Sequence, residues 1–163
     1  MNKRTPRFKS VMPILIALLI FSSLTSFSHA SEDRRHTTGQ TVYVPLYSNI
    51  FIGDKEITWQ LSALLSIRNT DPAHPITISS VEYYDSDGKL VRKYLEKSKQ
   101  VNTMGSAYFY VKTSDTAGGW GANFLVEWES EKKVNEPIIE SLMSGMRGNH
   151  SVSFISQGRV IDR

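Results

Sequence analysis

The chain has 163 residues and no cysteine, with 19 lysines and arginines against 16 aspartates and glutamates. The absence of cysteine excludes disulfides, cysteine-ligated zinc and the acylated cysteine of a bacterial lipoprotein. Four of the 19 basic residues and none of the acidic ones lie in residues 1–30, so the remaining 133 residues carry a net charge of −1. A near-neutral domain lacks the basic surface of a nucleic-acid binder, and we expect no nucleic-acid partner.

Residues 1–30 have the pattern of a cleavable signal peptide. A basic start precedes the apolar run 14–21, and Ser28 and Ala30 supply the small residues that a signal peptidase needs. The run is shorter than the roughly 20 residues of a bilayer span, although an uncleaved anchor is the alternative. We therefore expect a periplasmic or secreted protein that begins at Ser31 and has no membrane span after cleavage.

The region after residue 30 has the size of one domain. Residues 31–40 are polar without periodicity and predict a flexible lead-in to a single β-sandwich domain over 41–163. Alternation of apolar and polar residues predicts strands along this domain. They cover residues 42–46, 57–68, 75–84, 106–112, 122–128 and 151–156, with a continuation at 159–161.

Two local features refine the strand over 75–84. Its apolar parity changes, which predicts a β-bulge around Ser79 and Ser80. The turn 85–88 that follows predicts a hairpin with Gly88 at positive φ. Its alternating carboxylates resemble the start of an EF-hand calcium loop, but the next residues supply no further ligands. We interpret it as a hairpin turn and expect no metal site.

Residues 135–146 depart from the β pattern. Asn135 can cap a helix, Pro137 suits a first helical turn, and apolar residues recur at helical spacing. The segment predicts a short helix that covers one end or face of a sheet; a partner-binding helix is the alternative. The predicted fold is all-β: an antiparallel immunoglobulin-like β-sandwich with one short C-terminal helix. An open barrel satisfies the same pattern.

Several segments together resemble one known family. They are residues 65–72, 75–78, 81–85, 88–91, 118–124, 126–128, 137–140 and 153–159. On these segments the chain resembles exported bacterial proteins of the domain of unknown function 3124, over essentially the whole region after residue 30. The resemblance implies family membership but brings no assigned activity, catalytic residue or cofactor. The strand and hairpin pattern is also similar to small immunoglobulin-like extracellular modules.

The loop 113–121 is the most prominent candidate binding segment, because Gly118, Gly119 and Gly121 surround Trp120. It lacks the Gly-Lys-Ser/Thr ending of a phosphate loop and leads into a strand instead of a helix. Trp120 is then either a plug folded back onto the core or an aromatic platform for a ligand or partner. The preference of large aromatic side chains for burial favours the plug.

Other polar residues offer weaker signals. The remaining candidate ligand- or partner-binding residues are Asn123, Asp71 and Asp115. The histidines after residue 30 are His36, His74 and His150, and they lack the spacing of metal ligands. The candidate carboxylates for acid–base chemistry are Asp71, Glu82 and Asp115, without a nucleophile elbow or triad spacing beside them. We therefore assign no catalytic residue.

These observations favour an exported, non-enzymatic protein that binds another protein or a cell-envelope component through its loops. One alternative is an envelope hydrolase whose carboxylates meet His74 or His150 in the folded protein. A second is a carrier of a small ligand or metal, with Trp120 and nearby acids lining the site. We expect no cofactor, and the sequence leaves the oligomeric state open.

Overall fold

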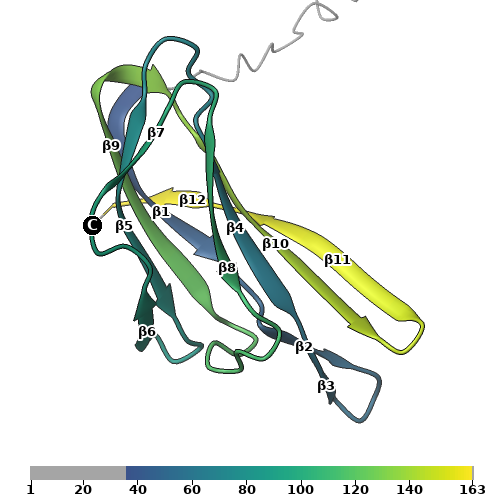
Figure 1. The fold of residues 1–163 in the computed structure, drawn as a ribbon. Coiled ribbons are helices and arrows are strands. Elements are labelled where there is room, and N and C mark those ends of the chain that lie inside the picture. The colour runs from purple at the N-terminus through teal and green to yellow at the C-terminus, as the bar shows by residue number, and fades with distance from the viewer. Residues whose placement is uncertain (1–35, 163) are drawn as a thin grey trace, which may run out of the picture. The chain divides into compact units, whose positions relative to one another are not determined.

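The computed structural model describes residues 36–162, and the structural statements below concern this part of the chain. The predicted signal peptide, residues 1–30, and the first half of the predicted lead-in, residues 31–35, lie outside the described residues. Strands account for all regular structure described, and every strand pair is antiparallel (Figure 1). The predicted all-β antiparallel class is confirmed.

The strands form two larger sheets and one hairpin. The six-stranded sheet has the order β12-β1-β9-β5-β6, and β7 also pairs with β5. Its strands are β1 (His36–Pro45), β5 (Ile76–Tyr84), β6 (Leu90–Lys93), β7 (Lys99–Val101), β9 (Asn123–Asn135) and β12 (Arg159–Ile161). The four-stranded sheet has the order β11-β10-β4-β8. Its strands are β4 (Ser62–Arg68), β8 (Ser106–Val111), β10 (Ile138–Arg147) and β11 (His150–Gln157). The hairpin consists of β2 (Asn49–Ile52) and β3 (Ile57–Gln60).

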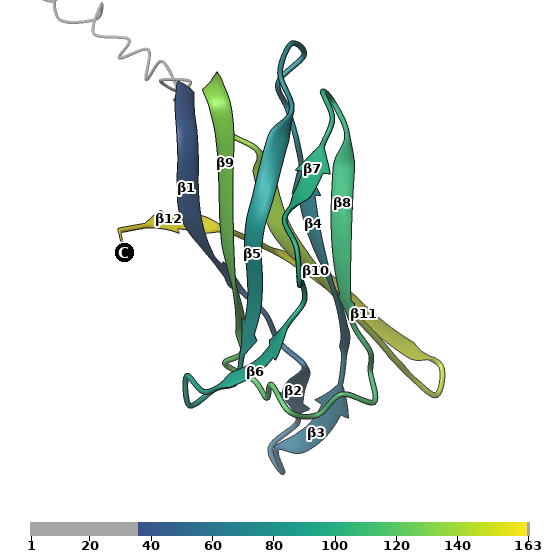
Figure 2. The same cartoon turned by 60° about the vertical axis from the view of Figure 1, so that its left-hand side comes forward.

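The two larger sheets share one hydrophobic core and appear as two layers in Figure 2. Alternate residues of each strand enter this core, as the period of a β-strand requires. The ring of Tyr94 lies between the layers, edge-on to Phe109 of β8 and to Phe124 of β9, with both centroid distances 5.7 Å. The core therefore joins the sheets without any disulfide.

Several local predictions are confirmed. The register of β5 against β9 shifts between Ile78 and Ser80, at the predicted bulge. The 85–88 turn joins β5 to β6, and Gly88 has a φ of 77°. The predicted strand over 57–68 is interrupted at Leu61, between β3 and β4. The predicted buried parity holds from Leu61 onward, whereas Ile57 is 45% exposed.

The first strand begins earlier than predicted. β1 starts at His36 and pairs with β9 along most of its length, so residues 36–40 of the predicted lead-in belong to the sheet. Polar residues can form a strand when a partner strand supplies backbone hydrogen bonds. The hydrophobicity of residues 36–40 gives no sign of this pairing with β9.

The predicted C-terminal helix is wrong. Residues 138–147 form β10, which pairs with β4 on one side and β11 on the other. Ile139, Ser141 and Met143 face the core, whereas Ile138 and Leu142 face outward. Ser141 is completely buried, and its hydroxyl donates a hydrogen bond to the Pro45 carbonyl oxygen. Because Ser141 is polar, the inward-facing positions of β10 do not show an unbroken apolar alternation in the sequence. Pairing with β4 and β11 determines the structure of this segment in spite of its helical spacing.

No helix in residues 36–162 has the length and apolar character needed to cross a membrane.

The strand assignment of residues 138–147 predicts opposite outcomes for two adjacent substitutions. Met143→Ala removes a completely buried side chain, so we expect the free energy of unfolding to fall by about 2–5 kcal/mol. Leu142→Ala, at a side chain on the outward face, should lower it by less than about 1 kcal/mol. Urea unfolding followed by circular dichroism measures both. Equal losses would contradict the strand, because a helix would place both residues on one apolar face.

Candidate functional site

The loops that carry the sequence candidates lie at opposite ends of the fold. In the β4–β8 pair, Ala63 lies opposite Val111 and Arg68 lies opposite Ser106. The loop 112–122 follows Val111, whereas Asp71 follows Arg68 at the other end. The structure therefore brings Trp120 and Asp115 to one end and separates both from Asp71.

The loop 112–122 is fixed on two sides by serine side chains. The backbone N–H of Gly119 donates to Ser48 Oγ at 2.7 Å, and the N–H of Gly121 donates to Ser86 Oγ at 2.9 Å. The N–H of Ser48 in turn donates to the Gly119 carbonyl oxygen, and that of Ser86 to the carbonyl oxygen of Gly118. These bonds join the loop to the β1–β2 connection and to the β5–β6 turn. Because these hydrogen bonds involve the backbone of the loop itself, they give the loop a defined conformation.

The glycines have specific steric roles in this loop. A Cβ on Gly118 would collide with the hydroxyl of Tyr83, which is completely buried. Burial raises the pKa of that hydroxyl to about 12. Gly119 has a φ of 79°, which favours glycine. The chain can therefore pass over Tyr83 and turn back into β9 only with small residues at these positions.

Trp120 is 60% exposed, so the interpretation as a core plug is wrong. The hydrogen bonds of the neighbouring glycines hold the backbone close to the protein while the indole remains in solvent. Asn123, another sequence candidate, is the first residue of β9 and pairs with Pro45 and Tyr84 in the sheet. Its position marks where the loop ends.

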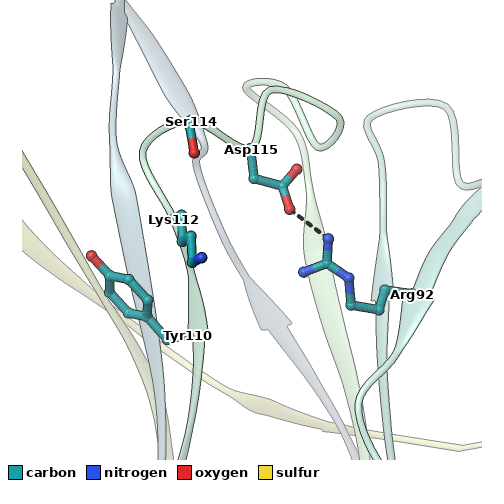
Figure 3. Close-up of a pocket in the computed structure, with 5 residues that line it drawn as sticks. All are labelled: Arg92, Tyr110, Lys112, Ser114 and Asp115. Atoms are coloured by element: carbon teal, nitrogen blue, oxygen red, sulfur yellow. Dashed lines mark hydrogen bonds and ion pairs between the residues drawn. The ribbon is translucent and has the colours of Figure 1, made fainter.

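A hollow of about 360 Å³ lies beside the first part of the same loop (Figure 3). It is lined by Arg92, Tyr110, Lys112, Ser114 and Asp115. Arg92 comes from β6 and the other four from β8 and the loop that follows it, so the hollow spans the edges of both sheets. Figure 3 shows Arg92 on one side and Tyr110 on the other, with Lys112 between them.

Arg92 is held in place by three contacts. Its Nη2 lies 2.9 Å from Asp115 Oδ2, and its Nη1 donates to the Tyr94 hydroxyl at 3.2 Å. The guanidinium carbon also lies 5.4 Å from the centre of the Tyr94 ring, within the range of a cation–π contact. The hydrogen bond that Arg92 donates to the Tyr94 hydroxyl contributes most to raising the pKa of Arg92, which remains a cation.

A sequence model of the family described as Protein of unknown function (DUF3124) matches residues 39–161. The chain belongs to this family. A crystal structure of the Thermotoga maritima protein 1070 resembles the DUF3124 chain with 13% sequence identity and a TM-score of 0.45, covering 74% of this chain and 92% of that one. No curated protein matches the chain.

In this DUF3124 protein Asp71 is a structural residue. Its Oδ1 accepts hydrogen bonds from the N–H groups of Ala73 and His74 at 2.9 Å, and its Oδ2 accepts one from Asn135 at 3.1 Å. These hydrogen bonds lower the pKa of Asp71 to about 2, and the one donated by the Ala73 N–H contributes most. Its carboxylate therefore connects the β4–β5 loop to the end of β9 and is no free ligand group.

Among the residues considered for chemistry, one carboxylate meets a histidine: Asp71 Oδ1 lies 3.3 Å from His74 Nδ1. Glu82 lies 2.8 Å from Lys93 and accepts a hydrogen bond from Tyr84 at 2.6 Å. His74 lies beside Asp71, whereas His150 lies at the start of β11. Within residues 36–162 no three His, Asp or Glu side chains are placed to hold a metal ion.

Sequence reasoning missed most of the hollow. Asp115 was a candidate, but Arg92, Tyr110, Lys112 and Ser114 were not. The sequence does contain one indication of the hollow. Tyr110 and Lys112 are two residues apart, so strand alternation places both on the same face at the end of β8. The decisive contact, however, joins Arg92 to a residue 23 positions away and depends on how β6 meets the loop.

The hydrogen bonds to Asp71 predict a pH effect on stability. The folded-state pKa of about 2 lies below the ordinary value of 3.8, so the stabilisation is complete above pH 3.8 and is lost as the pH falls towards 2. Asp71→Asn should lower stability near neutral pH and reduce the loss between these pH values. Urea unfolding at a series of pH values measures this effect.

Asp87→Asn is the control, because Asp87 is exposed in the 85–88 turn. It should leave both the stability and its acid dependence close to those of the native protein. If Asp71→Asn and Asp87→Asn behave alike across this pH range, the structural role of Asp71 is contradicted.

Proposed function

We propose that this DUF3124 protein is an exported, non-enzymatic binding module, periplasmic or secreted, whose loop 112–122 holds a protein or cell-envelope partner. One observation carries the proposal: Trp120 is exposed on a loop that hydrogen bonds fix on two sides. A preorganised aromatic side chain loses little conformational entropy on binding. Tryptophan is also enriched among the residues that contribute most to interface affinity.

Two further exposed apolar side chains lie on strands that follow the anchors of this loop. Phe51 of β2 and Leu90 of β6 are 51% and 39% exposed. Their strands follow Ser48 and Ser86, the two residues that anchor the loop of Trp120. A group of exposed apolar side chains on firmly held segments is typical of an interaction surface.

We also propose that the sheets form an immunoglobulin-like sandwich. In that fold strands B and E pair in one sheet, C and F lie in the other, and the chain crosses between sheets at B–C and E–F. Here β4 and β8 pair in one sheet, β5 and β9 pair in the other, and the corresponding connections cross. The edges differ, because β10 occupies the place of strand A beside β4 and β1 occupies that of strand G beside β9.

The export proposal rests on the sequence of residues 1–30, with its basic start, apolar run and small residues before Ser31. A cysteine-free domain is compatible with an oxidising compartment, because its core needs no disulfide. The hydrolase alternative has one contact in its favour, that of His74 Nδ1 with Asp71 Oδ1 at 3.3 Å. Both Asp71 oxygens also accept backbone hydrogen bonds, however, and Glu82 and Asp115 pair with Lys93 and Arg92.

Trp120→Ala tests the proposed function. The indole is exposed, so we expect the free energy of unfolding to change by less than about 1 kcal/mol. Binding should fall by about tenfold or more if the side chain is an interface anchor. The immobilised protein is exposed to a cell-envelope extract of the producing organism, and each retained component is quantified for native and variant protein.

Tyr108→Ala is the matched control, since Tyr108 is an aromatic residue that is 68% exposed on the outward face of β8. A component that the native protein and Tyr108→Ala retain equally, and that Trp120→Ala loses, supports the proposal. A large loss of stability in Trp120→Ala, with retention unchanged, would contradict it.

A further inference from the structure

We propose that the hollow lined by Arg92 and Lys112 binds a carboxylate or phosphate group carried on a small ring such as a sugar. The inference rests on the proposed function in one respect, because it takes this anionic group to belong to the partner held by loop 112–122. It adds the chemical class of the ligand and the residues that recognise it.

The charges of the hollow favour an anion. Arg92 and Lys112 are cationic and Asp115 is anionic, so the five lining residues carry a net charge of +1. Both Asp115 oxygens are engaged, Oδ1 by the N–H of Ala117 and Oδ2 by Arg92. Lys112 is exposed, and no residue in the described part of the chain pairs with its amino group. The uncompensated charge therefore belongs to a side chain that is free to contact a ligand.

The guanidinium of Arg92 is preorganised for such a ligand. Tyr94 holds it through a hydrogen bond and a ring contact, and the Tyr94 ring itself packs against Phe109 and Phe124. Asp115 fixes a second nitrogen. These contacts use two of the five N–H donors of an arginine. The remaining donors can form the paired hydrogen bonds that suit a carboxylate or phosphate.

The size and walls of the hollow limit what accompanies the anion. A volume of about 360 Å³ lies near the lower end of the usual range for ligand pockets, roughly 300–1,000 Å³. Tyr110 also lines the hollow, lies on the other side of Lys112 from Arg92 (Figure 3) and is 47% exposed. Its ring offers an apolar surface to the face of a sugar, while Ser114 adds a hydroxyl group. A single charged sugar ring satisfies both the volume and the chemistry.

A titration followed by nuclear magnetic resonance tests the inference on the purified protein. The probes are glucuronate, glucose 6-phosphate and uncharged glucose, which differ at the group on carbon 6. We expect both anionic sugars to cause saturable shifts of the Arg92 Nε–Hε signal and of the Ser114 and Asp115 amide signals, and glucose to cause none. The tighter of the two anions identifies a carboxylate or a phosphate ligand.

Two variants with the same change in charge separate a specific site from general attraction. Lys112→Gln should raise the dissociation constant by about tenfold, the effect of losing one charged hydrogen bond. Lys133→Gln, at an exposed position on β9, should leave it unchanged. Absence of saturable shifts, equal shifts with glucose, or equal effects of the two variants would overturn the inference.

The outcomes also distinguish this inference from the proposed function. Trp120→Ala should keep its affinity for the anionic sugars, because Trp120 does not line the hollow. If the sugars bind but no envelope component depends on Trp120, the proposed loop interface is wrong and the anion site stands. If a component depends on Trp120 and no anionic sugar binds, only the anion site is wrong.

Discussion

Side chains alternate between buried and exposed positions along the strands, and this alternation organises the whole fold. It directs the apolar residues of two antiparallel sheets into one core, where Tyr94 contacts both layers. Burial of this apolar surface is the dominant favourable contribution to folding, and no disulfide assists it. A core of this kind fixes the ends of the strands and so determines where each loop starts and stops.

The two ends of the fold use their loops differently. At one end the Asp71 carboxylate accepts three backbone hydrogen bonds and connects the β4–β5 loop to β9. At the other end Ser48 and Ser86 hold the backbone of the 112–122 loop and leave Trp120 in solvent. Of these two loops, it is the second that presents a large exposed aromatic side chain. This asymmetry is the physical basis for placing the interaction surface there.

The sequence predicted features that depend on neighbouring residues, such as the bulge near Ser80 and the turn at Gly88. It failed where distant residues decide the outcome. Ser141 interrupted the apolar alternation of β10, and pairing with β4 and β11 turned the expected helix into a strand. The loop of Trp120 was recognised, but the exposure of its side chain was not, because Ser48 and Ser86 lie 71 and 35 residues from their partners. The hollow likewise requires the meeting of Arg92 with Asp115.

Amide hydrogen exchange measures whether the loop 112–122 is rigid, as the proposed binding through an exposed tryptophan requires. The N–H groups of Gly119 and Gly121 donate to Ser48 and Ser86, so both should exchange slowly although they lie in a loop. Acrylamide should meanwhile quench the indole fluorescence of Trp120, measured as the difference between native protein and Trp120→Ala. Fast exchange at both glycines, or an indole shielded from the quencher, would contradict a rigid loop with an exposed Trp120.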